Sequence, residues 1–272
     1  MNRVMIPPEY FVRPVVARVQ DFLDGGTDNY AADRELARDL VAVAQWLRGS
    51  VRINRVHGAR VLGHLARELG IDQAIDLGCG LPHDEHMHVP DAVRRIVYVD
   101  SDPVVEAHAR MSLTERTGTA SLLADLTDVT ALLSAAPIRR LDHDRPIAVL
   151  LHDVPPWLDD DTARTTLQAL HARLPPGSVL SLTHATGDFA ADTQMQHLAE
   201  LYREAGIPFW PRNRTTLAML LGPWTLPGDR GLVTTAAWRP PGVAFSQPLS
   251  VHTWLDHSHA YAALATTGER TT

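Results

Sequence analysis

The sequence contains no lysine, and all 25 of its basic residues are arginines. A Schiff base, a pyridoxal phosphate anchor and the phosphate-binding lysine of a P-loop each require a lysine amine. The chain therefore cannot use any of these three chemistries.

The sequence also has few cysteines and no long apolar run, and both features bear on the cellular compartment of the protein. Cys79 is the single cysteine, so no internal disulfide can form, which fits a reducing environment. No apolar run is long enough to span a bilayer, and the first residues, MNRVMIPPEYFVRP, lack the apolar core of a secretory signal. We therefore expect a cytoplasmic protein with no membrane partner.

The charge balance is acidic, with 32 acidic against 25 basic residues and a formal net charge of −7. Proteins that follow phosphate backbones usually carry an excess of basic residues. Nucleic acid is therefore not an expected partner. A homodimer is one assembly that the sequence leaves open.

The first part of the chain predicts helices. Apolar residues of the stretch PVVARVQDFL recur three and four positions apart, the pair Gly25 and Gly26 interrupts this pattern, and two further helical stretches follow. Gly70 is expected to end the last of them. We assign residues 1–70 to an N-terminal helical cap.

After Gly70 the periodicity changes to short apolar, β-branched runs, which are typical of buried strands. Helical segments separate most of these runs, and this alternation indicates crossover connections and a mostly parallel sheet. The expected strands are 73–77, 96–100, 119–124, 147–152 and 178–185. We assign residues 71–239 to one α/β domain that binds the cofactor discussed below.

The end of the chain follows a different pattern. The stretch TLPGDRGLVTTAAW has a PGD turn between two candidate strands, which predicts an antiparallel hairpin at the sheet edge. Residues 240–272 carry Pro, Thr and His without a clear period. We assign them to a C-terminal extension, for which loose packing and partial disorder are both open.

The most informative motif is the turn after the first expected strand, in AIDLGCG. Gly78 and Gly80 let a ligand approach the backbone and permit the positive φ of a tight strand-to-helix turn. A dinucleotide fingerprint would need a third glycine at the position of His83. The glycine pair alone therefore leaves the kind of cofactor open.

Carboxylates at the ends of three successive strands narrow the choice. Asp100 stands where an acidic residue commonly binds ribose hydroxyls, and Asp125 stands where S-adenosylmethionine enzymes place a polar residue beside adenine. This pattern favours S-adenosylmethionine over a nicotinamide dinucleotide, and the alternative is that the aspartates only cap helices. The candidate cofactor-binding residues here are Asp76, Gly78, Gly80, Asp100, Ser101, Asp125 and Leu126.

With these residues the chain resembles a known family, the actinomycete S-adenosylmethionine-dependent methyltransferases long catalogued as a domain of unknown function. The likeness covers residues 12–239, and its most specific part is RVQDFLDGGTDNYAADRE (18–35). It continues through INR, DLGCGLP, VYVDSDPVV, ADL, LTHATGDF and YREAGIP. The resemblance implies a Rossmann-like class I methyltransferase fold, with a mostly parallel seven-stranded sheet, an antiparallel edge hairpin and N-terminal helices that cap the cofactor.

The segment HDEHMH, from His83 to His88, gathers imidazoles and carboxylates of the kind that bind zinc and other metals. Its order is not H-E-x-x-H, and no cysteine pair supports it. A substrate-side loop and a solvated polar loop are the alternatives. We predict no metal and place His83 in the substrate pocket.

The ligand crevice of a doubly wound sheet lies outside the carboxyl ends of its strands. There the fourth expected strand presents His152, Asp153 and Trp157, and the fifth presents His184. Histidine near its ordinary pKa can deprotonate a hydroxyl or amine acceptor, so His152 and His184 are our candidate catalytic bases. The alternative for both is a hydrogen-bonded structural role. Asp153 and Trp157 are assigned to the substrate pocket.

The loop GGTDNY offers another wall of the site. Asp28 and Asn29 are assigned to the methionine end of the cofactor, and Tyr30 to the substrate pocket. The alternative is that Asp28 or Asn29 caps the helix that follows. Tryptophans that could line an acceptor pocket, or fill the core instead, are Trp46, Trp157, Trp210 and Trp224.

These features together predict an S-adenosylmethionine-dependent methyltransferase that O- or N-methylates a small-molecule acceptor in specialised metabolism. Because the cofactor is already activated, such an enzyme mainly supplies proximity, alignment and for some acceptors a base. Two alternatives stay open. One is an enzyme that consumes S-adenosylmethionine by cyclisation or aminocarboxypropyl transfer, and the other is a non-catalytic protein that binds it.

Overall fold

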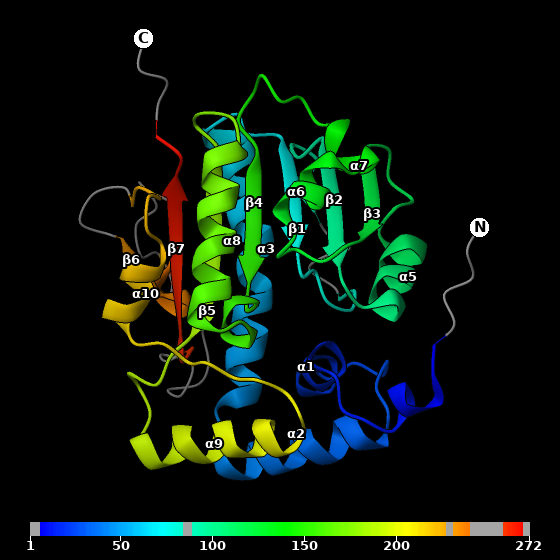
Figure 1. Cartoon of the computed structure of the whole chain (residues 1–272), viewed down its shortest axis with the longest axis vertical. Helices are drawn as coiled ribbons and strands as arrows, with labels where there is room; N and C mark the ends of the chain where they lie inside the picture. Colours follow the sequence, from blue (N-terminus) through cyan, green and yellow to red (C-terminus); the bar gives the residue numbers. More distant parts are fainter. Residues whose placement is uncertain (1–5, 84–88, 227–230, 240–257, 269–272) are drawn as a thin grey trace.

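The computed structural model describes residues 6–83, 89–226, 231–239 and 258–268. Its centre is a seven-stranded sheet in the order β3-β2-β1-β4-β5-β7-β6 (Figure 1). The first five strands are parallel, and β7 is antiparallel to β5 and β6. The strands are β1 (Gln73–Leu77), β2 (Arg95–Asp100), β3 (Thr119–Leu123), β4 (Ala148–His152), β5 (Val179–Ala185), β6 (Leu232–Thr234) and β7 (Ala260–Thr266). The predicted α/β fold, with its mostly parallel sheet and antiparallel edge strands, is confirmed.

Helices cover both faces of the sheet and one end of it. They are α1 (Val16–Asp24), α2 (Ala31–Val43), α3 (Leu47–Glu68), α5 (Pro103–Ser112), α6 (Val129–Ser134), α7 (Ala136–Arg139), α8 (Asp160–Arg173), α9 (Asp192–Glu204) and α10 (Arg214–Leu220). Short 3-10 turns are η1 (Pro8–Phe11), η2 (Pro155–Trp157) and η4 (Thr235–Ala237). No helix in the described ranges is long and apolar enough to cross a membrane.

Alternation along the strands builds two cores, one on each face. In β1, Ala74 belongs to the cluster packed against α3 and α5, whereas Ile75 and Leu77 belong to the cluster packed against α6, α8 and α10. This follows from the two-residue period of a strand, which sends successive side chains to opposite faces. Both faces are apolar, as parallel strands buried by crossover helices require.

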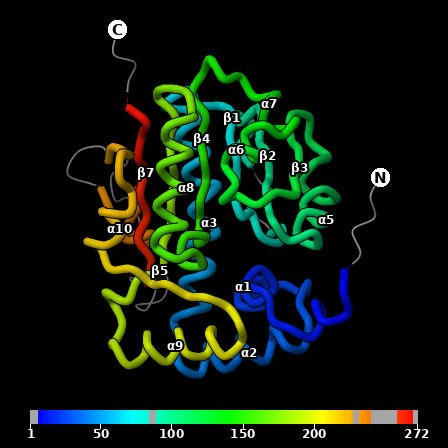
Figure 2. The backbone as a smooth tube through the Cα atoms, in the orientation of Figure 1, coloured from blue at the N-terminus to red at the C-terminus, as the bar shows by residue number. Residues whose placement is uncertain are grey.

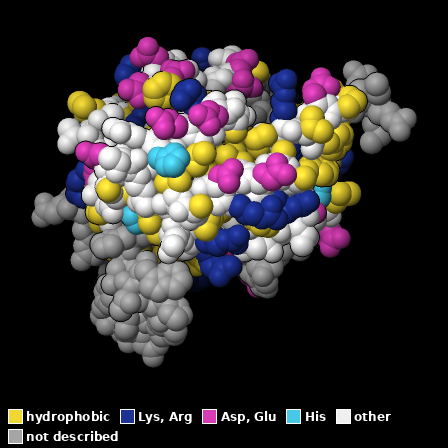
Figure 3. All heavy atoms as spheres, turned by 90° about the horizontal axis from the view of Figure 1, so that it is seen from below, with side chains coloured by type: hydrophobic (Ala, Val, Ile, Leu, Met, Phe, Trp, Pro, Cys, Tyr) yellow, Lys and Arg dark blue, Asp and Glu magenta, His cyan; other side chains and the backbone are white. Residues whose placement is uncertain are grey.

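A third apolar cluster forms the cap. It joins α1, α2, the start of α3 and α9 through buried residues such as Leu23, Leu40 and Leu198. Figure 1 shows the arrowheads of β2 and β4 pointing down toward this cap, and Figure 2 shows α2 and α9 running beside each other beneath the sheet. The carboxyl ends of the parallel strands therefore face the cap. Figure 3, which views the cap from below, shows arginines, carboxylates and apolar side chains interspersed on this face.

The helix α3 belongs to the cap and to the sheet alike. Its beginning packs with α1 and α2, while Val61, Leu62 and Leu65 near its end join the core on one face of the sheet. Gly70 follows it in the left-handed region, with φ +65°, where glycine carries no steric penalty. The cap is thus anchored to the domain by a continuous helix.

The C-terminal residues differ from the extension that the sequence predicted. Residues 260–266 form β7, which lies inside the sheet between β5 and β6. Its sequence, AYAALAT, is rich in alanine, which has a weak preference for strands, so no local signal marked it. Two flanking ladders of backbone hydrogen bonds hold it in the sheet instead. Residues 240–257 lie outside the described part of the chain.

The predicted hairpin around the PGD turn is also built differently. Leu232–Thr234 pairs with β7, and Thr225 on the other side of the turn forms a bridge with Thr266, also in β7. The two flanks of the turn therefore pair with a third segment and not with each other. The turn itself, residues 227–229, falls outside the described residues.

Candidate active site

A cavity of about 580 Å³ lies between the carboxyl ends of the parallel strands and the cap helices α1 and α3. This volume lies in the range of pockets that hold one small ligand. The cavity brings together the predicted residues Asp76, Gly78, Gly80, His83, Asp100, Ser101, Asp125, Leu126, His152, Asp153 and Trp157. It does not include the predicted residues Asp28, Asn29, Tyr30 and His184.

The glycine turn forms one wall. Gly78 and Gly80 both have φ +67°, in the region where side chains are strained. A Cβ added at Gly78 would lie 2.4 Å from Val154 Cγ2, whereas a Cβ at Gly80 would meet nothing within 4 Å. Gly78 is thus required by close packing against the loop after β4. Gly80 instead leaves its backbone open to the cavity, as a cradle for a ligand needs.

Asp100 joins this turn to the end of β2. Its carboxylate accepts hydrogen bonds from the N–H of Gly80 at 3.1 Å and the N–H of Asp102 at 2.9 Å. Burial raises the pKa of Asp100, and these backbone hydrogen bonds oppose the rise. The carboxylate is therefore fixed in orientation at the cavity wall, in the position expected for an acceptor of ribose hydroxyl hydrogen bonds.

Asp125 and Leu126 line the cavity after β3. The Asp125 carboxylate accepts hydrogen bonds from the N–H of Thr127 at 2.8 Å and from its hydroxyl at 2.7 Å. Leu126 packs against the core on one face of the sheet. Asp125 therefore shapes an exposed turn at the cavity rim, and Leu126 supplies an apolar surface.

The cap is locked by a buried ion pair. Arg18 and Asp33 are 2.7 Å apart with almost no exposed side-chain area. Arg18 also donates hydrogen bonds to the carbonyl oxygens of Tyr10 and Arg13. The Tyr10 hydroxyl in turn donates to the Asp102 carboxylate at 2.7 Å. These hydrogen bonds offset part of the cost of burying the charge, although Arg18 Nη1 has no hydrogen-bond partner among the described residues, and they hold the N-terminal arm over the cavity.

Asp28, Asn29 and Tyr30 do not reach the cavity. Asp28 is exposed and lies 3.6 Å from His108, and the Asn29 amide donates to the Asp21 carboxylate at 2.7 Å. Neither residue caps α2. The N-cap residue is Tyr30, and its N–H donates a hydrogen bond to the Asp33 carboxylate. The side chains of this loop thus hold the cap together. Asp28 and Asn29, assigned from the sequence to the methionine end of the cofactor, and Tyr30, assigned to the substrate pocket, therefore lie outside the set of cavity residues.

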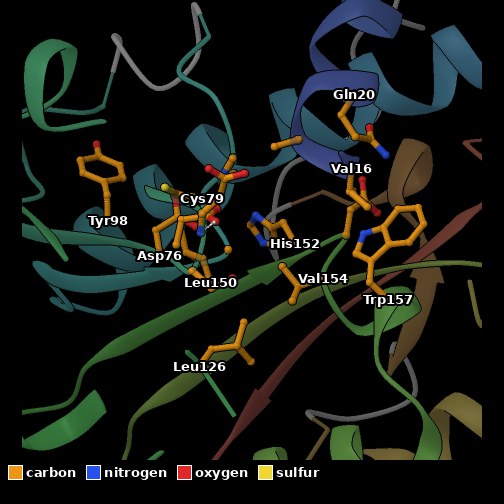
Figure 4. Close-up of a pocket in the computed structure, with 18 of the residues that line it drawn as sticks. Val16, Gln20, Asp76, Cys79, Tyr98, Leu126, Leu150, His152, Val154 and Trp157 are labelled. Carbon is orange, nitrogen blue, oxygen red and sulfur yellow. Dashed lines mark hydrogen bonds between the residues drawn. The ribbon is translucent and has the colours of Figure 1, made fainter. Parts of the chain in front are cut away.

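His152 occupies the middle of the cavity. Figure 4 shows Asp76 and Cys79 on one side of it and Trp157 on the other. Its Nε2 lies 2.8 Å from the Ser181 hydroxyl, and its ring meets that of His57 edge-on, with centroids 5.2 Å apart. Both neighbours fix the orientation of the imidazole within the wall.

Asp153 has an unusual backbone. Its φ is +55°, a conformation that is strained for a non-glycine residue and often marks a functional site. Its Oδ1 accepts hydrogen bonds from the Asn54 amide at 3.1 Å and the Thr183 hydroxyl at 3.2 Å. Burial raises the pKa of Asp153 to about 6, against these two hydrogen bonds, which lower it.

His184 lies apart from the cavity, in surroundings that favour a structural role. It is fully buried away from the cavity. Its Nδ1 lies 2.6 Å from the carbonyl oxygen of Ala185, and its Nε2 accepts a hydrogen bond from Arg212 at 2.9 Å. Burial above all lowers the pKa of His184 to about 3. Both ring nitrogens are thus engaged, and the structural alternative that the sequence left open describes this histidine.

His184 is one of several hydrogen-bond acceptors around the guanidinium of Arg212. The guanidinium also donates to the carbonyl oxygens of Pro155 at 2.8 Å and Leu158 at 2.7 Å, and to the Asp160 carboxylate at 2.8 Å. Arg212 therefore ties the loop that carries Trp157 to the ends of β5 and α8. No sequence pattern singled out this arginine, because its partners are distant in the chain.

Further cavity residues that sequence reasoning missed come from the cap. Gln20 of α1 and Asn54 and Arg55 of α3 line the cavity. Arg55 lies 3.7 Å from the Asp24 carboxylate, and Asn54 holds Asp153 as described. The INR motif at 53–55 was the signal that could have found two of them.

His83 lines the cavity, but residues 84–88 of the histidine-rich segment lie outside the described residues. The prediction for that loop therefore stays a prediction. Elsewhere in the described ranges, no group of three or more His, Cys, Asp or Glu residues gathers as a metal site would require.

Three of the four tryptophans take one of the two roles considered, and Trp210 takes neither. Trp157 lines the cavity, and Trp46 stacks on His259 with ring centroids 3.6 Å apart beside it. Trp224 is buried and donates from its indole to the carbonyl oxygen of Leu167, so it fills the core. Trp210 is 48% exposed.

The sheet order, the open glycine turn and the Asp100 carboxylate define a class I methyltransferase site. Comparison with known proteins agrees, because residues 11–267 match the S-adenosyl methyltransferase family. The chain belongs to this family, it is an S-adenosylmethionine-dependent methyltransferase, and its cofactor is S-adenosylmethionine. The resemblance found in the sequence is confirmed.

Two solved structures from actinomycetes are similar over nearly the whole chain. A candidate methyltransferase from Thermobifida fusca YX is 32% identical with a TM-score of 0.82, and the match covers 98% of this chain and 100% of that one. A DUF574 family protein from Streptomyces avermitilis MA-4680 is 28% identical with a TM-score of 0.82, covering 94% and 98% of the two chains. No curated protein matches the sequence.

Proposed function

We propose that this enzyme methylates a nitrogen or oxygen atom of a small-molecule acceptor, which binds between the helical cap and the carboxyl ends of β4 and β5. The observation that carries this proposal is the enclosure of the site. A second cavity of about 40 Å³ adjoins the main one, and α3 and α9 cover it. Space of this size suits a small functional group and not a folded partner. The assignments to specialised metabolism and to the cytoplasm remain predictions.

The residues of the larger cavity fit S-adenosylmethionine by chemistry. Asp100 is suited to accept hydrogen bonds from ribose hydroxyls, and Leu126 offers an apolar surface to adenine. Arg55 is suited to the carboxylate of the methionine arm, and Asp76 to its ammonium group. When bound, the cofactor supplies a methyl group already activated on a sulfonium.

The protein's own residues contribute alignment. His152 is held by Ser181 and His57, so its imidazole has a fixed orientation in the cavity wall. Its catalytic role stays a prediction. Asp153 is the better candidate for handling an acceptor proton, because burial raises its pKa to about 6 and its carboxylate borders both cavities.

Titration calorimetry with S-adenosylhomocysteine tests the cofactor site. The substitution Asp100→Ala is expected to weaken binding by about 10-fold or more, because hydrogen bonds to a charged group contribute roughly 1.5–3 kcal/mol. The matched control is Asp161→Ala, an exposed aspartate of α8 whose partner is Arg164. Equal affinity in the wild type and the Asp100 variant would remove Asp100 from the site.

Product analysis separates this function from its alternatives. Methyl transfer releases S-adenosylhomocysteine, whereas cyclisation or aminocarboxypropyl transfer releases methylthioadenosine. Incubation of the enzyme with S-adenosylmethionine and a mixture of small amines and alcohols is expected to yield the first product. Accumulation of methylthioadenosine would overturn the proposal, and binding with no turnover of any acceptor would favour the non-catalytic alternative.

A further inference from the structure

The smaller cavity is lined by aromatic rings, and we call it the aromatic chamber. Trp157, Tyr202 and Phe209 pack against one another there in edge-on and tilted arrangements. The ring centroids of Trp157 lie 5.2 Å from those of both Tyr202 and Phe209, and Tyr202 and Phe209 are 5.0 Å apart. The residues shared with the larger cavity, which form the border between the two, are Gln20, Asn54, Asp153 and Trp157.

Asp153 places one carboxylate at this border. Its Oδ1 accepts hydrogen bonds from Asn54 and Thr183. No described residue donates a hydrogen bond to its Oδ2. Its backbone N–H donates to the Thr183 hydroxyl at 2.9 Å, which fixes the positive φ. The strained conformation therefore aims a partly satisfied carboxylate at the junction of two cavities. Burial raises the pKa of Tyr202, and the negative charge of Asp153 raises it further.

This combination of groups selects a cation. A half-buried carboxylate with an open oxygen is stabilised by a ligand that carries positive charge and an N–H donor. Trp157, Tyr202 and Phe209 line the same cavity, and an aromatic ring attracts a cation that lies over its face through the quadrupole of the ring. A neutral alcohol can donate one hydrogen bond to the carboxylate but brings no positive charge, whereas an ammonium group adds its charge to that of Arg55, which already acts on Asp153.

We propose that the aromatic chamber is an amine-recognition site, in which Asp153 binds the ammonium group of the methyl acceptor. This inference rests on the proposed function and specifies its acceptor as a small aliphatic amine. A single water-sized group needs about 10–15 Å³, so 40 Å³ accommodates the amino group and the carbon beside it. The body of the acceptor must then lie in the larger cavity or toward its mouth.

Asp153 also prepares the amine for reaction. An ammonium nitrogen has no lone pair, so it cannot act as a nucleophile. Transfer of one proton breaks an N–H bond, leaves its electron pair on nitrogen and forms an O–H bond at Asp153 Oδ2. The carboxylate becomes a neutral acid, and the amine becomes neutral and nucleophilic. Burial raises the pKa of Asp153 to about 6, so this carboxylate accepts the proton more readily than an exposed carboxylate would.

Calorimetry with two isosteric probes tests the inference. The protein is first saturated with S-adenosylhomocysteine, and n-butylamine or 1-butanol is then titrated into it. Wild type is expected to bind n-butylamine at least 10-fold more tightly than 1-butanol, the size of one charge-assisted hydrogen bond. In Asp153→Asn the two probes should bind within 3-fold of each other. Asparagine tolerates positive φ, so this variant keeps the backbone. Asp161→Asn is the matched control and should keep the wild-type ratio.

A second variant covers the case in which Asp153→Asn does not fold. Phe209→Leu removes one aromatic face and should lower the affinity for n-butylamine by about 2- to 5-fold, with 1-butanol unchanged. Wild type that binds S-adenosylhomocysteine but shows no preference for the amine would overturn the inference and leave the proposed function intact. Retention of the amine preference in Asp153→Asn would overturn it as well. Absence of S-adenosylhomocysteine binding in wild type would contradict the proposed function itself.

Discussion

The two glycines of the cofactor turn allow one physical effect to be separated from another. Gly78 and Gly80 have the same φ of +67°, so replacing either by alanine imposes the same left-handed strain, roughly 1–2 kcal/mol. Their surroundings differ, because a Cβ at Gly78 would lie 2.4 Å from Val154 Cγ2 and a Cβ at Gly80 would meet nothing within 4 Å. Valine is stiff about χ1, so Val154 cannot simply rotate away. Overpacking of this kind adds about 1–3 kcal/mol.

We therefore expect Gly80→Ala to lower the free energy of unfolding by about 1–2 kcal/mol, and Gly78→Ala to lower it by about 2–5 kcal/mol. Urea denaturation of the ligand-free proteins measures both. The double variant Gly78→Ala with Val154→Ala should regain part of the loss, giving a favourable coupling energy of about 1 kcal/mol or more. Equal destabilisation by the two single substitutions, or additive behaviour in the double variant, would refute the packing argument.

For the affinity of S-adenosylhomocysteine, the larger effect is expected from the substitution that destabilises the protein less. Gly80 lines the cavity and a Cβ there would meet no protein atom within 4 Å, so the methyl group of Gly80→Ala adds bulk at the cavity wall. This variant should lose affinity by about 10-fold or more although it remains the more stable of the two. Affinity close to that of wild type would show that the backbone at Gly80 does not contact the cofactor.

Three further outcomes are expected. The pKa of Asp153 is raised from 3.8 to about 6 in the folded state, so the folded protein binds a proton more readily than the unfolded chain between these values, and stability falls as pH rises through that window. Relative to Asp153→Asn, wild type should therefore gain about 2 kcal/mol between pH 7 and pH 4 in urea denaturation, and a constant difference would contradict the raised pKa. His184→Leu leaves an N–H of Arg212 without its acceptor, so it should cost about 1–3 kcal/mol of stability while S-adenosylhomocysteine affinity stays within about 2-fold; a large loss of affinity at unchanged stability would instead indicate a role in the site. His57 is fully buried and neither ring nitrogen has a hydrogen-bond partner among the described residues, so His57→Phe should stabilise the protein by about 1–2 kcal/mol, and a loss of stability would show that the imidazole is satisfied.

Local sequence patterns located the parallel part of the fold well. The expected strand 73–77 coincides with β1, and the other four expected strands differ from β2 to β5 by one residue at one end. Apolar runs bounded by turn residues are short-range signals, so they can be recognised from the sequence alone. The same holds for the glycine turn, whose conformational demands lie in Gly78 and Gly80 themselves. Asp100 was found because it follows a strand directly.

Other features depend on which segments meet in space. The identity of residues 260–266 as a strand comes from hydrogen bonds to β5 and β6, since an alanine-rich segment has no strong preference of its own. His184 looks like a base in the sequence, and only the approach of Arg212 shows that its second nitrogen is occupied. The strained φ of Asp153 likewise depends on Thr183 from the neighbouring strand.

The sequence by itself therefore determined the sheet, the cofactor turn and the chemical class, because these follow from periodicity, turn geometry and side chains at strand ends. The tertiary structure decided which polar side chains remain available for chemistry. Whether a histidine or carboxylate is free to act depends on its hydrogen-bond partners and on water exclusion, and those partners come from residues far apart in the chain.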